Sequence, residues 1–299
     1  MTQGVPRLRW AVQTAAWGSR LGPEEWAFLL SLLQEDERQQ CLRHRQPEDQ
    51  RRALVARLLA RRAAAASLGL PQAAVECRRT KGGKPYIANE LPGKANGPAP
   101  NWNFSVSHEG DYVILAAEPL CICGCDVVAP LHLRRRSGEP LAKFFARFDR
   151  QFTPTEWQRI RGAGGDAEQE AEFSKMWALK EAYVKATGEG LGFDLGKVEF
   201  SISGGTATAS LCGMPQRDWA FHLHELGAGH WAAVARAPLS AVVDAWGGFK
   251  ATFRKPDLSP GEWQQQLAAA EPPFQLLTVA DLVPLDQRDT YEAAGGDLL

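Results

Sequence analysis

The sequence predicts an α/β protein made of two similar halves followed by an extension. Its 299 residues exceed one average domain, and 44% of them are apolar, which is enough for a substantial core. An internal match supports the two halves, because YVILAAEPL at residues 112–120 resembles WAAVARAPL at residues 231–239. The same separation of 119 residues superposes Glu37 on Glu156. A repeat of this length is typical of a whole domain.

After Glu37 in the first half and Glu156 in the second, the chain contains a helix-forming stretch that ends in a Gly-Leu pair. The two stretches cover residues 51–70 and 171–191, with their ends 121 residues apart. We therefore predict an N-terminal half at residues 1–118, a C-terminal half at 119–240 and an extension at 241–299. A cleft between two such halves is the expected ligand site.

Local patterns predict further elements. Residues 4–17 begin with alternating polar and apolar side chains and predict an opening strand. Residues 51–67 are rich in Ala, Leu and Arg and predict a helix that stops at Gly69, with its arginines either solvated or facing an anionic partner. In the extension we expect a helix at 262–270, an apolar segment at 274–283 and a mobile end.

Charge and cysteine content exclude several classes of protein. The chain carries 34 basic and 35 acidic residues, a net charge of -1, which argues against a nucleic-acid binder. Its six cysteines form no CxxC pair and no regular disulfide framework, which favours a reducing compartment, the cytosol. The first residues lack the apolar run of a signal peptide or membrane helix. We expect a cytosolic protein without a membrane anchor.

Two segments could bind anionic groups. Residues 78–84, RRTKGGK, place four cations around two glycines, which allows a tight turn whose side chains converge on a phosphate. The alternative is a basic surface hairpin without a ligand. Residues 103–111, NFSVSHEGD, predict a strand whose hydroxyls and His108 could hydrogen-bond phosphate oxygens or simply satisfy a turn. A serine hydrolase is excluded because the GxSxG elbow is absent.

The CICGC run at residues 121–125 predicts a central strand that ends on a carboxylate. Alternation places its three cysteines on one face and Gly124 and Asp126 on the other. The cysteines are therefore expected to be small buried side chains rather than metal ligands. On the opposite face, Gly124 is expected to leave room for a ligand beside Asp126.

The segment WALKEAYVK at residues 177–185 predicts a helix with Trp177, Glu181 and Lys185 on one face. Lys180 lies about 100° around the helix from Glu181. Together Asp126, Glu181 and Lys185 can hold a magnesium ion against a pyrophosphate. For Glu181 and Lys185 taken alone, the alternative is an ordinary ion pair on the surface of the helix.

Because Gly188, Gly190, Leu191 and Phe193 follow, this segment resembles the signature of the 4′-phosphopantetheinyl transferases. The chain resembles the two-domain, single-chain type of the animal cytosol over residues 7–283, which include QEDER at 34–38 and FQLLTVADL at 274–282. The resemblance implies two pseudo-symmetric α/β halves in a monomer, with coenzyme A in the cleft. It also implies transfer of the phosphopantetheine arm to a serine of an acyl or peptidyl carrier protein, with release of adenosine 3′,5′-bisphosphate.

Residue roles are implied by the same resemblance. Asp126 and Glu181 would bind magnesium, Lys185 would contact the pyrophosphate, and we hypothesise that Glu181, directly or through water, accepts the proton of the carrier serine. Val128 stands where many members carry a second acid, which leaves the choice between magnesium and manganese open. Ser105 stands where close relatives have asparagine. The residues implied to contact coenzyme A are Arg38, Arg79, Thr80, Lys81, Gly82, Gly83, Lys84, Ser105, Val106, Ser107, His108, Glu181 and Lys185.

Two other functions compete with catalysis. A non-catalytic scaffold that binds coenzyme A or a carrier protein is disfavoured because the trio Asp126, Glu181 and Lys185 is intact, and a nucleic-acid binder is disfavoured by the balanced charge. The resemblance makes three carriers plausible: fatty-acid synthase, an aminoadipate-reducing enzyme and a mitochondrial carrier protein. We expect an acidic carrier helix to dock on the hydrophobic and basic surface around residues 140–160, which include LAKFFARF, unless this segment is an ordinary amphipathic core helix.

Overall fold

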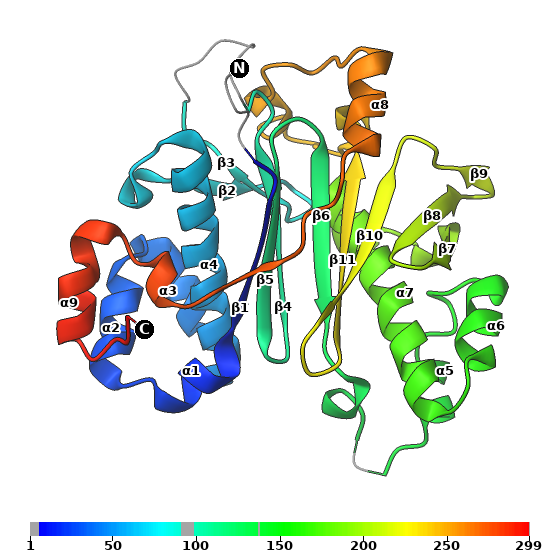
Figure 1. Cartoon of the computed structure of the whole chain (residues 1–299), viewed down its shortest axis with the longest axis horizontal. Coiled ribbons are helices and arrows are strands. Elements are labelled where there is room, and N and C mark those ends of the chain that lie inside the picture. The colour runs from blue at the N-terminus through cyan, green and yellow to red at the C-terminus, as the bar shows by residue number, and fades with distance from the viewer. Residues whose placement is uncertain (1–5, 91–98, 137, 299) are drawn as a thin grey trace.

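A computed structural model of the chain describes residues 6–90, 99–136 and 138–298. Two sheets stand side by side in the middle of the molecule, with one group of helices on each outer side (Figure 1). One sheet has the strand order β12-β1-β5-β4, the other has β6-β11-β10-β8-β7 with β9 beside β8, and a separate hairpin pairs β2 with β3. This mixed architecture confirms the predicted α/β class.

The first half consists of a short antiparallel sheet covered by helices on one face. Strand β5 is buried along its whole length, and the long helix α4 packs on β5 and β4. Its strands are β1 (Leu8–Gln13), β2 (Cys77–Arg79), β3 (Pro85–Ile87), β4 (Asn103–Glu109) and β5 (Tyr112–Glu118). Its helices are α1 (Thr14–Arg20), α2 (Pro23–Ser31), α3 (Glu35–Leu42) and α4 (Pro47–Leu68).

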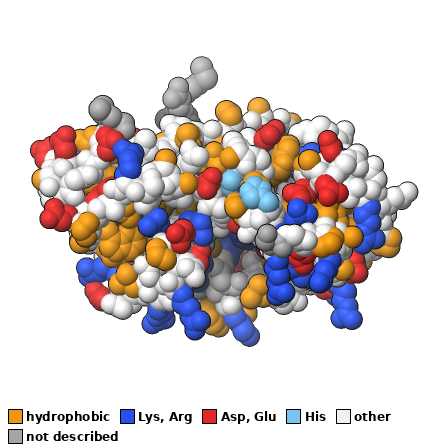
Figure 2. Space-filling model, turned by 90° about the horizontal axis from the view of Figure 1, so that it is seen from below, with side chains coloured by type: hydrophobic (Ala, Val, Ile, Leu, Met, Phe, Trp, Pro, Cys, Tyr) orange, Lys and Arg blue, Asp and Glu red, His pale blue; other side chains and the backbone are white. Residues whose placement is uncertain are grey.

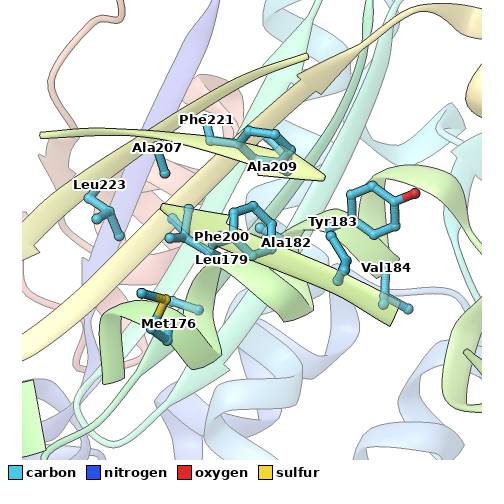
Figure 3. Packing of buried hydrophobic residues seen from close by; sticks show 14 of the residues in the cluster. Met176, Leu179, Ala182, Tyr183, Val184, Phe200, Ala207, Ala209, Phe221 and Leu223 are labelled. Carbon is cyan, nitrogen blue, oxygen red and sulfur yellow. The ribbon is translucent and has the colours of Figure 1, made fainter. Parts of the chain in front are cut away.

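The second half repeats this plan around a larger sheet. Aromatic and aliphatic side chains of α7 pack against this sheet, and Figure 3 shows Leu179 beside Phe200 and Phe221 in that core. Its strands are β6 (Ile122–Val128), β7 (Val198–Ser203), β8 (Thr206–Leu211), β9 (Met214–Pro215), β10 (Ala220–Leu226) and β11 (His230–Ala237). Its helices are α5 (Leu141–Ala146), α6 (Pro154–Gly162) and α7 (Asp166–Thr187).

The long helices α4 and α7 have the same length and the same kind of end. Each has 22 residues, and each is closed by a glycine in the left-handed conformation, Gly69 or Gly188. These glycines are 119 residues apart. The two halves therefore align with a constant separation of 119 residues. The alignment of the two Gly-Leu pairs at a separation of 121 was wrong, because the second helix ends at Gly188, before the pair at residues 190 and 191.

A buried acid and a buried cation occupy matching positions in the two halves. In the first half Glu37 of α3 pairs with Arg61 of α4, and in the second Glu156 of α6 pairs with Lys180 of α7 at 2.8 Å. In both cases the acid caps the start of its own short helix and the cation comes from the long helix. The superposition of Glu37 on Glu156 in the sequence thus reflects a shared structural position.

Side chains rather than a backbone ladder join the two sheets. Asn103 of β4 accepts from the Cys123 N–H of β6 and donates to the Cys121 carbonyl, and Ser105 Oγ accepts from the Cys125 N–H. Cys123 and Cys125 of β6 and the preceding Cys121 are free and buried at this joint. The expectation that they are small core side chains is confirmed.

The space beside Gly124 is filled by protein. A Cβ atom at this position would lie 2.0 Å from the carbonyl oxygen of Ala182 and 2.4 Å from the amide nitrogen of Ala186. Gly124 therefore lets the backbone of α7 approach β6 closely. The expectation that it leaves room for a ligand was wrong, although the close approach brings the side chains of α7 near Asp126.

The C-terminal extension is a strap across both halves. After α8 (Pro260–Ala268), strand β12 (Gln275–Leu277) pairs in parallel with β1, and α9 (Arg288–Ala293) packs near α2, as the orange and red chain in Figure 1 shows. Tyr291 of α9 is buried and donates to Glu25 at 2.7 Å. The expectation of a mobile end was wrong, because α9 packs its buried Tyr291 into the first half, and β12 completes the sheet of that half.

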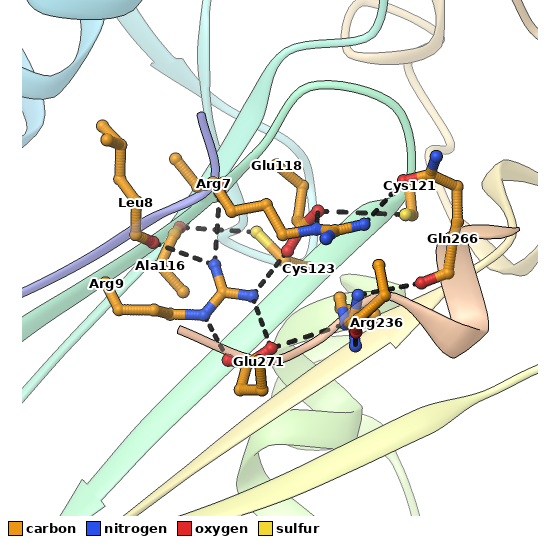
Figure 4. Close-up of polar contacts among 12 residues, drawn as sticks. Arg7, Leu8, Arg9, Ala116, Glu118, Cys121, Cys123, Arg236, Gln266 and Glu271 are labelled. Atoms are coloured by element: carbon orange, nitrogen blue, oxygen red, sulfur yellow. Dashed lines mark hydrogen bonds and ion pairs between the residues drawn. The ribbon is translucent and has the colours of Figure 1, made fainter. Parts of the chain in front are cut away.

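A buried charge network fastens the strap to both halves (Figure 4). Glu271 of the strap pairs with Arg9 of β1 at 2.5 Å and lies 3.6 Å from Arg236 of β11. Arg9 also pairs with Glu118 of β5 at 2.5 Å. One carboxylate from the extension therefore neutralises cations of both sheets.

The opening strand is shorter than predicted. Strand β1 stops at Gln13, where the Thr14 N–H bonds to the Asp111 carbonyl and the chain turns into α1. Positions 4 and 5 of the predicted strand lie outside the described residues. Within the described part of the chain, every helix is too short or too polar to cross a membrane.

Candidate active site

A cavity of about 720 Å³ lies between the two halves. Helix α4, the β2–β3 hairpin and β4 supply its walls from the first half, and α7 with the loop after it supplies the walls from the second. In Figure 2 the molecule is hollowed near its middle, with Lys and Arg side chains around the recess. The cleft predicted between the halves is present, and it is lined mainly by basic and apolar side chains.

Asp126, Lys185 and Ser107 meet at one end of this cavity. Lys185 Nζ lies 2.6 Å from Asp126 Oδ1 and 2.8 Å from Ser107 Oγ, and Ser107 donates to Asp126 at 2.6 Å. Burial alone would lower the pKa of Lys185, but the contact with Asp126 raises it. The lysine is therefore a fixed cation. Ser107 lies on strand β4, Asp126 on strand β6 and Lys185 on helix α7.

Glu181 lies one helical turn before Lys185 and also lines the cavity. Burial, together with the negative charge of Asp126, raises the pKa of Glu181, while Lys185 and Arg134 oppose this shift. The same explanation holds for Glu109, whose pKa is raised by burial although Arg134 pairs with it at 2.9 Å. Acidic groups from three elements therefore influence one another electrostatically in this region.

The described residues contain no group of three or more His, Cys, Asp or Glu side chains arranged to hold a metal ion. A magnesium ion, however, needs only one or two carboxylates when phosphates and water complete its shell. Asp126 binds Lys185 and Ser107 through Oδ1 alone, and the mutual repulsion of Asp126 and Glu181 would be relieved by a divalent cation. The residues present fit such an ion. Lys180 is elsewhere, buried beside Glu156.

The basic loop at residues 78–84 is the turn of the β2–β3 hairpin, and its residues point in different directions. Lys84 is buried, and its Nζ donates to the carbonyls of Cys123 and Lys185, so that it joins the two halves. Thr80 is buried and closes the turn by accepting from the Lys84 N–H. Arg79 and the two glycines line the cavity, whereas Lys81 is exposed outside its lining. A coenzyme A contact stays a prediction for each of them.

Gly82 touches the loop after α7. A Cβ atom on Gly82 would lie 1.8 Å from the Gly188 carbonyl, and one on Gly190 would lie 2.5 Å from the Gly82 carbonyl. The glycines of the two motifs therefore permit a close contact of two backbones. Gly82, Gly188 and Gly190 all line the cavity, so this contact joins the two halves at its wall.

Strand β4 forms the floor of the cavity. Ser105, Val106, Ser107 and His108 all line it, but the Ser105 hydroxyl already accepts from Cys125 N–H. The His108 ring is exposed to the cavity. The surrounding protein walls, followed by the Lys185 cation, lower the pKa of His108 to about 4. His108 is therefore neutral near pH 7 and can hydrogen-bond a phosphate without adding charge.

Sequence reasoning missed three arginines of the cavity and included one that lies outside its lining. Arg57 and Arg61 of α4 and Arg150 line it, so the arginine helix is more than a solvated face; Arg61 is only 1% exposed. Arg38 pairs with Glu35 at 2.6 Å on the adjoining α3. Matching α4 to α7 would have found Arg61, because it stands 119 residues before Lys180.

Residues 141–148 are mainly core. Phe144 and Phe145 of α5 are buried and pack against Phe173 of α7. Lys143 and Arg147 are exposed, and Arg147 pairs with Glu139. The amphipathic alternative thus describes this helix, because its aromatic side chains are committed to the interior and only its polar face can meet a partner.

Comparison with known proteins matches both halves. A family model described as the N-terminal 4′-phosphopantetheinyl transferase domain matches residues 16–120, and the model of the 4′-phosphopantetheinyl transferase superfamily matches residues 122–235. The L-aminoadipate-semialdehyde dehydrogenase-phosphopantetheinyl transferase of Rattus norvegicus is 31% identical over 288 residues, covering 92% of this chain and 85% of the rat protein. The chain belongs to the 4′-phosphopantetheinyl transferase superfamily.

Other phosphopantetheinyl transferases extend this relationship beyond mammals. The phosphopantetheinyl transferase of Thraustochytrium sp. is 35% identical over 76% of this chain and 77% of its own length. A Bacillus subtilis 4′-phosphopantetheinyl transferase is 30% identical over 56% of this chain and 65% of its own length. The family expected from the WALKEAYVK segment is thus confirmed, and this transferase places that segment on the wall of its cavity.

Proposed function

We propose that this phosphopantetheinyl transferase moves the 4′-phosphopantetheine group of coenzyme A to a serine of an acyl or peptidyl carrier protein. The observation that carries the proposal is the meeting of Asp126, Ser107 and Lys185 at one end of a basic cavity shared by both halves. The reaction needs such charge neutralisation, because the serine oxygen attacks one phosphorus of a pyrophosphate while the bond to the other phosphate breaks.

Each residue of this end has a distinct role. Glu181 lies at the cavity wall and accepts the proton of the carrier serine, directly or through water, as the new oxygen–phosphorus bond forms. Its raised pKa, caused by burial and the Asp126 charge, makes it a better base than an ordinary carboxylate. Lys185 neutralises the charge that develops on the leaving group, adenosine 3′,5′-bisphosphate.

Asp126 and Glu181 would hold the magnesium ion that the family resemblance implies. Such an ion supplies charge neutralisation at the pyrophosphate oxygens. Val128 of β6 is buried and apolar, so it adds no ligand to this site. Asp126 orients Lys185, and Ser107 fixes the orientation of both through its hydroxyl.

The partners and setting of the enzyme follow from the same reasoning. A monomer is sufficient because one chain supplies both walls of the cavity. The cytosol is favoured because all six cysteines are free. Carriers of the fatty-acid synthase type and of the aminoadipate-reducing type are the proposed acceptors, the latter because several relatives are named for an aminoadipate-semialdehyde dehydrogenase.

The direct test is a transfer assay with an apo carrier protein, coenzyme A and magnesium. Intact-protein mass spectrometry should detect the gain of one phosphopantetheine group, and peptide mapping should place it on serine. Glu181→Gln keeps the size of the side chain but removes the base, so we expect its activity to fall close to background with an unchanged circular dichroism spectrum. Near-wild-type turnover by Glu181→Gln would remove this residue from the mechanism. The absence of modification by wild-type enzyme on a panel of carriers would contradict the proposed function.

A further inference from the structure

The duplicated acid–cation pairs differ in one respect. In the second half, both carboxylate oxygens of Glu156 are occupied. Oε1 accepts from the Phe200 N–H at 2.9 Å, while Oε2 accepts from the Thr153 N–H at 2.8 Å and lies 2.8 Å from Lys180 Nζ. The Glu156 side chain is 0% exposed. This carboxylate is therefore a purely internal group.

Within the described chain, its counterpart Glu37 forms its contacts through one oxygen. The Gln34 N–H and the Arg61 guanidinium both donate to Oε2, the latter through Nε at 3.0 Å. Among the residues that the structure describes, no donor contacts Oε1. The Glu37 side chain is 11% exposed, and the residue lines the cavity. One nearly buried carboxylate oxygen is thus left for a ligand in the first half only.

The surroundings of Glu37 fit a nucleoside that carries phosphate. Arg57 donates to the Ala53 carbonyl and to Gln40, and Arg79 donates to the Gly83 carbonyl, so that the described hydrogen bonds of both cations end on neutral groups. Their charge is available to an anion in the cavity. An apolar wall for a flat base lies beside them, formed by Ala56, Ala60, Val75, Phe104 and Val106.

We propose that Glu37 is a specificity-determining residue that recognises the adenine of coenzyme A. Its Oε1 accepts a hydrogen bond from the 6-amino group, while Arg57 and Arg79 face the 3′-phosphate. This inference rests on the proposed function, because coenzyme A is the nucleotide in question. A 6-oxo base would turn a carbonyl oxygen toward the carboxylate, and two acceptors with no proton between them repel. The matching acids of the two halves thus differ in role: Glu156 is structural, whereas Glu37 also recognises the adenine.

The first test needs no variant. Isothermal titration calorimetry of the wild-type protein should give coenzyme A an affinity at least about tenfold higher than its hypoxanthine analogue, in which oxygen replaces the 6-amino group. Equal affinities would overturn the proposal. Because calorimetry needs no carrier protein, this result stands apart from the transfer assay, whose failure would instead contradict the proposed function.

Glu37→Gln and Glu156→Gln form a matched pair of variants. In Glu37→Gln the amide oxygen stays with Arg61 and the amide NH₂ replaces Oε1, so the preference for coenzyme A over the hypoxanthine analogue should disappear or reverse. Glu156→Gln should lower the thermal midpoint and leave the wild-type preference intact. An unchanged preference in Glu37→Gln would overturn the proposal, as would an equal loss in Glu156→Gln, which would indicate a general effect of folding.

A third ligand distinguishes the amino group from the ribose. The 2′-deoxy analogue of coenzyme A keeps the adenine and loses the other neutral donor of the nucleoside. We expect wild type and Glu37→Gln to lose affinity for this analogue by the same factor relative to coenzyme A. If Glu37→Gln abolished the discrimination at the 2′ position and kept the discrimination at the 6 position, the assignment to the base would be wrong.

Discussion

Lys185 Nζ lies 2.6 Å from Asp126 Oδ1, although the two residues are on different elements, α7 and β6. The contact exists because Gly124 lets the backbone of α7 approach β6. Burial would favour the neutral amine, and the carboxylate reverses this by raising the pKa of Lys185. The positive charge of the site is therefore set by the packing of a helix on a strand.

Removal of this charge should abolish most of the activity. Lys185→Met keeps the length of the side chain, leaves Asp126 without its cation and removes the group that stabilises the leaving phosphate. We expect kcat to fall roughly 100-fold or more, as for other fixed groups that stabilise developing charge. The carrier assay under saturating coenzyme A measures this. Lys185→Arg is the control that keeps the charge and should retain more activity than Lys185→Met. A Lys185→Met enzyme with a tenth of wild-type kcat would refute this role.

Arg57 and Arg38 give opposite expectations for coenzyme A binding. Arg57 lines the cavity with neutral partners, whereas Arg38 pairs with Glu35 on α3. We therefore expect the loss of coenzyme A affinity on substitution of Arg57 rather than of Arg38. Arg57→Ala should weaken coenzyme A binding by about 2 kcal/mol, about thirtyfold, through loss of a charge-assisted contact. Arg38→Ala should change it little, and calorimetry that ranks the two variants in the reverse order would show the assignment to be mistaken.

Gly124→Ala should destabilise the protein strongly. The added methyl group would lie 2.0 Å from the Ala182 carbonyl oxygen, a backbone atom of α7 that cannot move without shifting the helix. We expect the free energy of unfolding to fall by roughly 3 kcal/mol, measured by urea denaturation. Gly261→Ala in α8 is the control, because a Cβ atom there meets nothing within 4 Å. Similar small effects of both substitutions would mean that α7 and β6 are less closely packed than described.

Glu271 should make the stability of the protein sensitive to acid. Burial alone would raise its pKa, but contacts with His224 and Arg9 lower it to about 2. The carboxylate therefore contributes stability that is complete above the ordinary glutamate pKa of about 4.5 and is lost as the pH falls toward 2. Glu271→Gln should remove this part of the pH dependence and lower the stability at pH 7 by about 3 kcal/mol, because Arg9 and Arg236 lose a partner. Thermal unfolding of both proteins between pH 2 and 7 measures the effect, and parallel curves would contradict it.

Much of the fold could be predicted from local patterns. The arginine-rich segment forms α4 and stops at Gly69, as Ala and Leu content followed by glycine indicates. Alternation along the CICGC run correctly separated the cysteine face from the Asp126 face. The extension was harder to predict, because β12 and α9 are short segments whose structure depends on the first half. The pairing of β12 with β1 and the burial of Tyr291 in α9 both depend on residues more than 250 positions earlier in the chain.

Site residues could be predicted from the sequence where their spacing fixes their relative positions. They could not be predicted where tertiary packing decides which side chains are buried and which are exposed. Glu181 and Lys185 share a helix face by their spacing alone. Arg38 and Arg57 look alike in the sequence, yet only Arg57 reaches the cavity lining. Lys84 belongs to a basic loop, but its ammonium is bonded to two carbonyls inside the protein. Sequence spacing carries no information on which partner a long side chain will find.

By itself the sequence determined the family, the duplicated α/β plan and the helix face shared by Glu181 and Lys185, because these depend on spacing within one element and on motifs in fixed order. The roles of Asp126, Glu181 and Lys185 stay predictions. Only the tertiary structure decided that α7 rests against Gly124, that the strap ties both sheets through Glu271, and that Glu37 keeps one oxygen open where Glu156 keeps none. The physical reason is that burial and hydrogen-bond partners come from segments distant in the chain, whose approach no local pattern records.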